Sequence, residues 1–140
     1  MSHRRILLLC AVLTAIAGAG LLLAREPEGQ NDVEAKLLLQ EALAGEPGKE
    51  VNMQLYTFPP GASVPWHIHP DAHEFDYGVS GTLTLQMEGQ PDRELKAGEA
   101  VYVPPNVVHR GINASKTEPM QVFVVRVKPK DTPLTTIVPH

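Results

Sequence analysis

Short runs of alternating apolar and polar residues, each ended by a turn-forming residue, follow one another along residues 51–128. Alternation with a period of two is typical of β-strands, because successive side chains point to opposite faces. The breaks between the runs contain Gly, Pro or Asn, and no helical pattern separates them. This rhythm predicts an all-β sandwich or barrel. The expected strands are 51–58, 63–69, 74–79, 82–88, 93–96, 99–103, 107–113 and 121–128.

The segment 33–44 carries two competing signals. Its charged residues and alanines favour a helix that Gly45 would end. A run of three leucines at 37–39, followed by turn-forming residues, equally fits a short buried strand. We expect the strand.

Residues 1–24 have the pattern of a targeting segment. Arg4 and Arg5 form a short positive region, and residues 6–24 are hydrophobic and uncharged. Small residues at 17–19 allow cleavage as a signal peptide, whereas an uncleaved helix of this length would anchor the chain in a bilayer. Both interpretations place the domain outside the cytoplasm, as a periplasmic, secreted or membrane-anchored protein, because the arginines stay on the inner side.

The chain is therefore expected to have four parts. They are a targeting helix at 1–24, a polar linker at 25–32, a β-barrel at 33–132 and a C-terminal tail at 133–140.

Composition excludes several classes of function. Without residues 1–24 the chain has 10 basic and 16 acidic side chains, a net charge of −6, which disfavours nucleic acid as a partner. The only cysteine, Cys10, lies in the hydrophobic segment. The expected domain therefore has no disulfide, no thiolate nucleophile and no cysteine-ligated zinc.

A histidine pair is the first candidate for chemistry. His67 and His69 lie two apart in an expected strand, so their imidazoles share one face and can chelate a metal ion. Glu74 opens the next strand, where its carboxylate can turn toward them. Two exposed surface histidines are the competing interpretation, and spacing alone does not connect the pair to His109.

Two longer patterns include these residues. They are Gly61-x5-His67-x-His69-x4-Glu74-x6-Gly81 and Gly98-x5-Pro104-x-Asn106-x2-His109-x3-Asn113. In this order they resemble the two motifs of the cupin superfamily, in a small single-domain form. Asn106 stands where the second motif has glycine, and asparagine tolerates a left-handed backbone better than most residues.

The resemblance implies a double-stranded β-helix, a jelly-roll barrel, with one divalent metal ion inside. It assigns His67, His69, Glu74 and His109 as the ligands. Three imidazoles and one carboxylate suit Mn, Fe, Ni, Zn or Cu. On an octahedral ion this set leaves two positions open for water, dioxygen or a substrate oxygen.

Two polar neighbours of Glu74 have open roles. His73 would take the ligand position if the gap after His69 were one residue shorter, but the count to Gly81 favours Glu74 and places His73 at the rim. Asp76 shares a face with Glu74. It is expected either to accept a hydrogen bond from a ligand histidine or to turn outward at a strand edge.

Aromatic residues and one arginine complete the candidates for the pocket. Tyr77, Tyr102, Phe58 and Phe123 are expected to pack in the core or between subunits, or to line a substrate cavity. Arg126 is isolated among valines, and is expected to face outward or to bind a substrate carboxylate.

Two functions are consistent with these features. One is a non-haem metalloenzyme, such as a dioxygenase or isomerase, acting on a small oxygen-bearing substrate, with Glu74 or another pocket acid moving protons. The other is a non-catalytic module that binds a metal or a small ligand. A second copy could pair through the strand at 37–39, and membrane contact is restricted to residues 6–24 if these are not cleaved.

Overall fold

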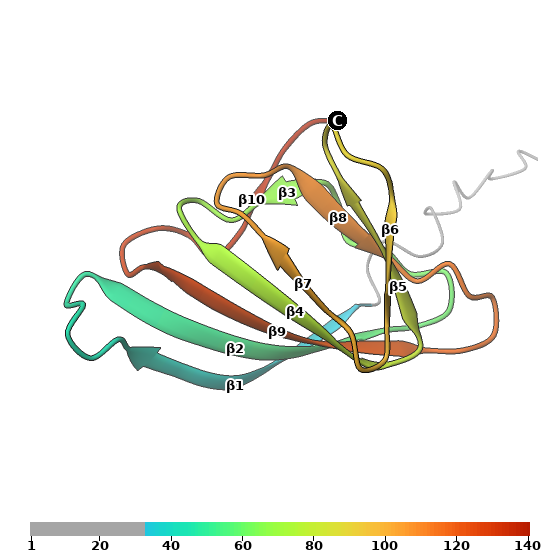
Figure 1. Ribbon diagram of the computed structural model, residues 1–140, viewed down its shortest axis with the longest axis horizontal. Coiled ribbons are helices and arrows are strands. Elements are labelled where there is room, and N and C mark those ends of the chain that lie inside the picture. Colours follow the sequence, from blue (N-terminus) through green and yellow to red (C-terminus); the bar gives the residue numbers. More distant parts are fainter. Residues whose placement is uncertain (1–32) are drawn as a thin grey trace, which may run out of the picture.

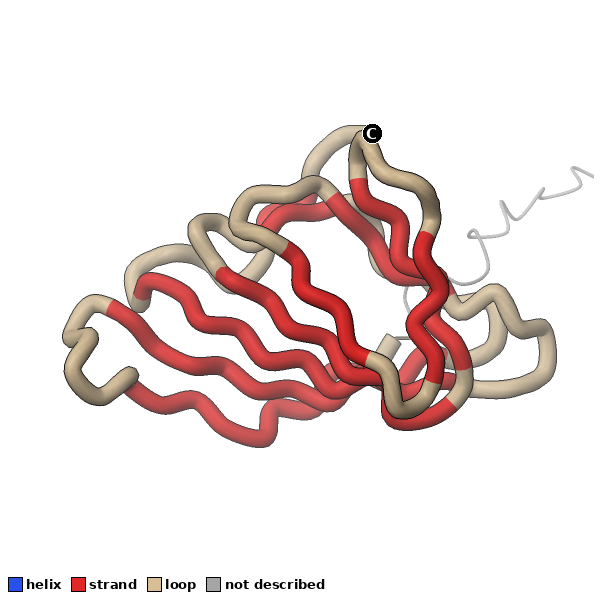
Figure 2. The backbone as a smooth tube through the Cα atoms, viewed as in Figure 1, coloured by secondary structure: helices blue, strands red, loops and turns tan. Residues whose placement is uncertain are grey.

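The computed structural model describes residues 33–140, which form ten β-strands and no helix (Figure 2). The strands are β1 (Glu34–Ala42), β2 (Lys49–Phe58), β3 (His67–Ile68), β4 (His73–Ser80), β5 (Thr82–Met87), β6 (Arg93–Lys96), β7 (Ala100–Val103), β8 (His109–Ile112), β9 (Met120–Pro129) and β10 (Thr136–Ile137). The predicted all-β class is confirmed. Within these residues no helix is long and apolar enough to cross a membrane. The predicted targeting helix lies outside them.

Two five-stranded antiparallel sheets enclose the core (Figure 1). The first has the order β1-β2-β9-β4-β7 and the second β10-β3-β8-β5-β6. Alternation places one row of each strand inside: in β5, Leu83, Leu85 and Met87 are buried and the residues between them are half-buried. These rows pack against Val122 and Val124 of β9, so the core lies between the sheets.

The segment that carried competing signals is a strand, β1, and the alternative helix is wrong. It pairs antiparallel with β2 along its length, with an irregularity between Leu37 and Leu39. Its leucines are nevertheless exposed, at 39–53% of their surface. The expectation of a buried strand is corrected, because β1 forms the edge of its sheet (Figure 1).

The strand expected at 63–69 is reduced to β3, and Ser63 makes only an isolated bridge to Ile112. Pro65, which has no N–H to donate, lies between the two pieces. Residues 133–140, expected to lie outside the barrel, instead contribute β10, which pairs antiparallel with β3. The end of the described chain therefore lies beside the candidate histidines.

Two turns with left-handed residues, one after β3 and one after β7, are joined by hydrogen bonds. Asn106 has a φ of 63° and Asp71 a φ of 54°. The amide of Asn106 donates to the Asp71 carboxylate at 3.0 Å and accepts from the Asp71 backbone N–H at 3.1 Å. The expected left-handed conformation of Asn106 is confirmed. This double contact fixes the turn before Glu74 against the loop before His109.

Candidate metal centre

Three histidines converge inside the barrel. His67 lies in β3 directly opposite His109 of β8, and His69 follows two residues after His67. Each has less than 8% of its surface exposed. One ring nitrogen from each of the three lies within 4.8 Å of the others. The structure thus brings together the local pair and the distant histidine that spacing alone could not connect.

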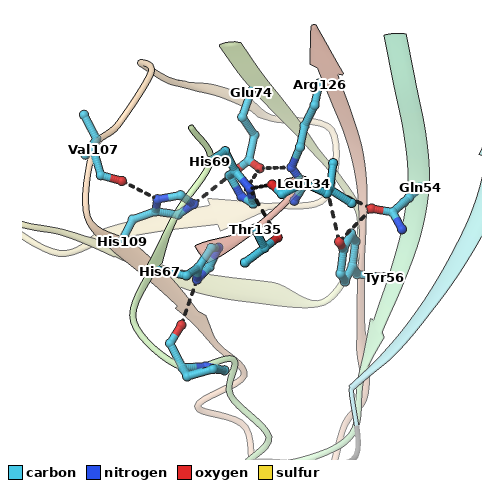
Figure 3. A network of polar contacts seen from close by, with 11 residues as sticks. Gln54, Tyr56, His67, His69, Glu74, Val107, His109, Arg126, Leu134 and Thr135 are labelled. Carbon is cyan, nitrogen blue, oxygen red and sulfur yellow. Dashed lines mark hydrogen bonds and ion pairs between the residues drawn. The ribbon is translucent and has the colours of Figure 1, made fainter. Parts of the chain in front are cut away.

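Backbone carbonyls orient all three imidazole rings (Figure 3). The Nδ1 atoms of His67 and His109 each lie against the carbonyl two residues earlier, at 2.7 and 2.8 Å. That of His69 lies against the carbonyl of Leu134, 65 residues later. Because a carbonyl only accepts, each Nδ1 carries the proton and each Nε2 keeps a free lone pair.

Glu74 of β4 places its carboxylate against two of these lone pairs. Oε2 lies 2.8 Å from His69 Nε2, and Oε1 lies 3.2 Å from His109 Nε2. Burial alone would raise the pKa of Glu74, but the charge of Arg126 outweighs it and holds that pKa well below its usual range. Glu74 is therefore ionised.

These contacts fit a bound cation. His69 Nε2 is buried and has no hydrogen bond of suitable geometry among the described residues. A nitrogen lone pair facing an ionised carboxylate oxygen is repelled unless a positive charge lies between them. A metal ion supplies that charge, and imidazole nitrogen with carboxylate oxygen is a common donor set for transition metals. The three histidines can therefore hold a metal ion.

Arg126 of β9 belongs to this network, contrary to the expectation that it faces outward. Only 4% of its surface is exposed, and its Nε donates to Glu74 Oε2. Its Nη1 donates to Gln54 at 2.9 Å and to the Tyr56 hydroxyl at 3.2 Å (Figure 3). The prediction failed because β9 is apolar on both faces. The Nε and Nη1 groups of Arg126 already donate to protein groups, so these donors are not free to bind a substrate carboxylate.

Asp76 lies two residues after Glu74 on the inner face of β4 and is 4% exposed. Its Oδ1 has no hydrogen-bond partner among residues 33–140, so the expected contact with a ligand histidine is absent there. Burial, and then the charge of Glu74, raise the pKa of Asp76 well above its ordinary range, against the opposing charge of Arg126.

The other expected pocket residues lie on the outer face of the sheet. His73, Tyr77 and Tyr102 are exposed, and none lines the cavity beside the histidines. His73 Nδ1 lies 2.7 Å from the Tyr102 hydroxyl, with the two rings stacked. The interpretation that placed Tyr77 and Tyr102 in the pocket is corrected, and His73 does not reach it. His73 and Tyr77 are next to Glu74 and Asp76 in an alternating strand and so face the opposite way. Tyr102 of β7 pairs with Phe75 of the same outer row. Phe58, in contrast, lies in the core and lines the cavity.

A cavity of about 170 Å³ lies beside His67 and His109. His67, Glu74 and His109 form part of its wall, so it leads directly to the candidate metal position. Thr135 and Ile137, from the segment that contains β10, line it as well. The centre is therefore not filled by side chains.

The metal-free protein is expected to lose stability as the pH falls from 6.5 to 4. Burial, and then the charge of His109, lower the pKa of His67 to about 4 from its ordinary 6.5. Between these values the unfolded chain binds a proton at His67 that the folded protein does not, so acid favours unfolding. The loss attributable to His67 is about 3 kcal/mol by pH 4. Urea unfolding at pH 7 and pH 4 measures it. An unchanged pH dependence in a His67→Gln variant would contradict the assignment.

Comparison with known proteins places this geometry in context. The Cupin domain family (Cupin_2) matches residues 54–126. Oxalate oxidase 1 of Hordeum vulgare is 34% identical over 79 residues, which cover 51% of this chain and 39% of that protein. Germin-like protein 3-3 of Oryza sativa subsp. japonica is 31% identical over 106 residues, which cover 69% and 44%. The chain thus spans less than half the length of these relatives.

Solved structures share the architecture. A Klebsiella pneumoniae protein with a double-stranded β-helix domain matches with a TM-score of 0.62 at 21% identity, covering 83% of this chain and 90% of that one. An oxalate oxidase in complex with the substrate analogue glycolate matches with a TM-score of 0.60 at 25% identity, covering 89% and 68%. The two sheets therefore have the fold of a double-stranded β-helix.

Proposed function

We propose, starting from the fact that this chain belongs to the cupin domain family, that it binds one divalent transition metal ion through His67, His69, His109 and Glu74. The family match contains all of these residues. The observation that carries the proposal is the convergence of three oriented Nε2 lone pairs and one ionised carboxylate in a buried site. Such nitrogen and oxygen donors suit Mn, Fe, Ni, Zn or Cu.

The ligand or substrate is a small oxygen-bearing acid. The cavity at the histidines has room for a small molecule, and relatives of this chain are named oxalate oxidases, one of them solved with glycolate. Glu74 and Arg126 carry opposite charges, so a divalent cation leaves the centre with an excess of positive charge that an anionic ligand neutralises.

The chain acts as a small metalloenzyme. A bound metal would supply Lewis acidity or activation of dioxygen. Arg126 keeps Glu74 ionised and holds one of its oxygens, and Glu74 is the carboxylate placed to accept a proton from the bound molecule. Glu74 and Arg126 are 3% and 4% exposed, so bulk water has little access to them.

A non-catalytic ligand-binding module is the second candidate, and one observation favours it. Glu74 is held by Arg126 and lies against two histidines, and a carboxylate so engaged is not free to act as a base. Under this alternative the same metal and acid bind, and no turnover follows.

Metal analysis of the purified protein tests the proposal. We expect about one transition metal ion per chain, and release of that metal by a chelator should lower the thermal stability, because the ion binds only the folded state. Oxygen consumption or loss of substrate with small carboxylic and hydroxy acids then separates enzyme from module. A protein that takes up no transition metal would refute both.

Deleting residues 134–140 is expected to lower metal affinity by about 10–100-fold. The Leu134 carbonyl holds the Nδ1 proton of His69, so its loss frees the ring to rotate. Competition with a chromogenic chelator measures the affinity.

Deleting only residues 138–140 is the matched control. It removes the hydrogen bond from Val138 N to the Trp66 carbonyl and the stacking of His140 on Trp66, but keeps Leu134. Equal loss of affinity in both deletions would show that the Leu134 carbonyl is not responsible.

We also propose that the barrel acts outside the cytoplasm, on the support of the hydrophobic, uncharged segment at 6–24 behind Arg4 and Arg5. Fractionation of expressing bacteria should recover the domain in the periplasm, the medium or the membrane. Recovery in the cytoplasm would contradict the proposal.

A further inference from the structure

The cavity has two chemically different ends. Its polar end is formed by His67, Glu74, His109 and Arg126, together with Asp76. The rest of its lining includes the apolar side chains of Phe58, Leu83, Leu85, Val122 and Val124. All five of these are buried members of the core. Val124 and Val122 lie two and four residues before Arg126 on the buried face of β9, so the lining becomes apolar with distance from the charged groups. A molecule that fills the cavity therefore contacts charged groups at one end and hydrocarbon at the other.

We propose that the natural ligand is a 2-hydroxy acid with a short apolar side chain, and not a wholly polar acid such as oxalate. The proposal rests on the metal and acid site described above and names the class of molecule that it takes. The anionic head lies at the histidines and the apolar chain lies against Val122 and Val124. A wholly polar acid would leave this apolar wall without a partner.

The size of the cavity sets the length of the side chain. A cavity of about 150 Å³ lined by apolar side chains holds one molecule of benzene. At about 170 Å³ this cavity is slightly larger. Oxalate or glycolate would fill only part of it, whereas a 2-hydroxy acid with a three-carbon chain comes closer to filling it.

Asp76 supports the hydroxyl group of the ligand. Its side chain is 96% buried, lines the cavity and leaves Oδ1 without a partner among the described residues. An unpartnered buried oxygen is unfavourable, and a ligand group can satisfy it. A hydroxyl both donates and accepts, so it can bind the Asp76 carboxyl group whether or not that group is protonated.

Calorimetric titration of the metal-loaded full-length protein with glycolate, oxalate and 2-hydroxypentanoate tests the proposal. Glycolate and 2-hydroxypentanoate share one head and differ only by the apolar chain. Transfer of each methylene group from water to an apolar site raises affinity by about fourfold. We expect 2-hydroxypentanoate to bind at least about tenfold more tightly than glycolate or oxalate. Equal or weaker binding, or binding of none of the three, would overturn the proposal.

Two substitutions at Val124 locate the effect. Val124→Phe fills the apolar end and should bring the ratio of the two hydroxy-acid affinities close to one. Val124→Thr keeps the shape of the side chain but replaces one methyl group with a hydroxyl. It should lower the ratio by several-fold, and it provides the test even if the larger phenylalanine prevents folding. A ratio unchanged in the folded variants would overturn the proposal.

Metal content, measured on the same samples, separates this inference from the proposed function. Metal bound with no preference for the longer acid refutes only the ligand class. Absence of metal refutes the metal centre. The ratio of the 2-hydroxypentanoate and glycolate affinities, measured on that metal-free protein, still decides whether the apolar end selects the ligand.

Discussion

Replacing Arg126 with leucine is expected to lower the free energy of unfolding of the metal-free protein by about 3–5 kcal/mol. This is the loss that follows when one partner of a buried ion pair is removed. Arg126 and Glu74 are 4% and 3% exposed, and the guanidinium is the cation that compensates the carboxylate. Its removal leaves the buried Glu74 carboxyl group without its compensating charge and breaks the hydrogen bonds to Gln54 and Tyr56. Urea unfolding measures the change.

Two further variants identify the cause. Arg126→Lys keeps the charge but not the planar fork of donors, so its loss of stability should be smaller than that of Arg126→Leu. A double variant, Arg126→Leu with Glu74→Leu, removes both charges and should be more stable than Arg126→Leu alone. A double variant less stable than the single one would show that packing, and not the unpaired charge, dominates.

Replacing His69 with alanine is expected to lower metal affinity strongly, because it removes a nitrogen that binds the metal directly. Loss of a hydrogen-bond partner of a ligand costs about 10–100-fold in affinity, and the loss in this variant should be larger. His69 is 3% exposed and its Nε2 faces Glu74. Water can replace the missing nitrogen only as a weaker donor. The metal content of the purified variant and competition with a chelator measure the loss.

His73→Ala is the matched control for this substitution. His73 lies four residues from His69, but it is exposed on the outer face, where it contacts Tyr102. Metal affinity should therefore stay within about twofold of the parent. A loss equal to that of His69→Ala would mean that His73 is the ligand and that the inner and outer faces of β4 are assigned wrongly.

The strands could be predicted where one face is apolar and the other polar. In β5, Leu83 and Leu85 alternate with threonines, so the alternation shows both the strand and its buried face. In β9 both faces are apolar, and the sequence does not show which is inside, so Arg126 was assigned to the wrong face. β10 has only two residues and exists through its pairing with β3, which is a contact between distant segments.

The sequence predicted which side chains form the candidate site, but not which backbone carbonyls orient them. The resemblance to two motifs connected His109 to the local pair, and the pairing of β3 with β8 places it opposite His67. The carbonyl that orients His69 belongs to Leu134. Every residue has a carbonyl, so this partner has no signature in the sequence and appears only when the chain is folded.

The different origins of these carbonyl partners set an order for assembly during protein synthesis. His67 and His109 each take a partner two residues upstream, which has already been made when the histidine itself is added. His69 waits for Leu134, 65 residues later. A nascent chain that has not yet reached Leu134 therefore presents an incomplete set of oriented rings, and tight metal uptake requires that residue to have been added.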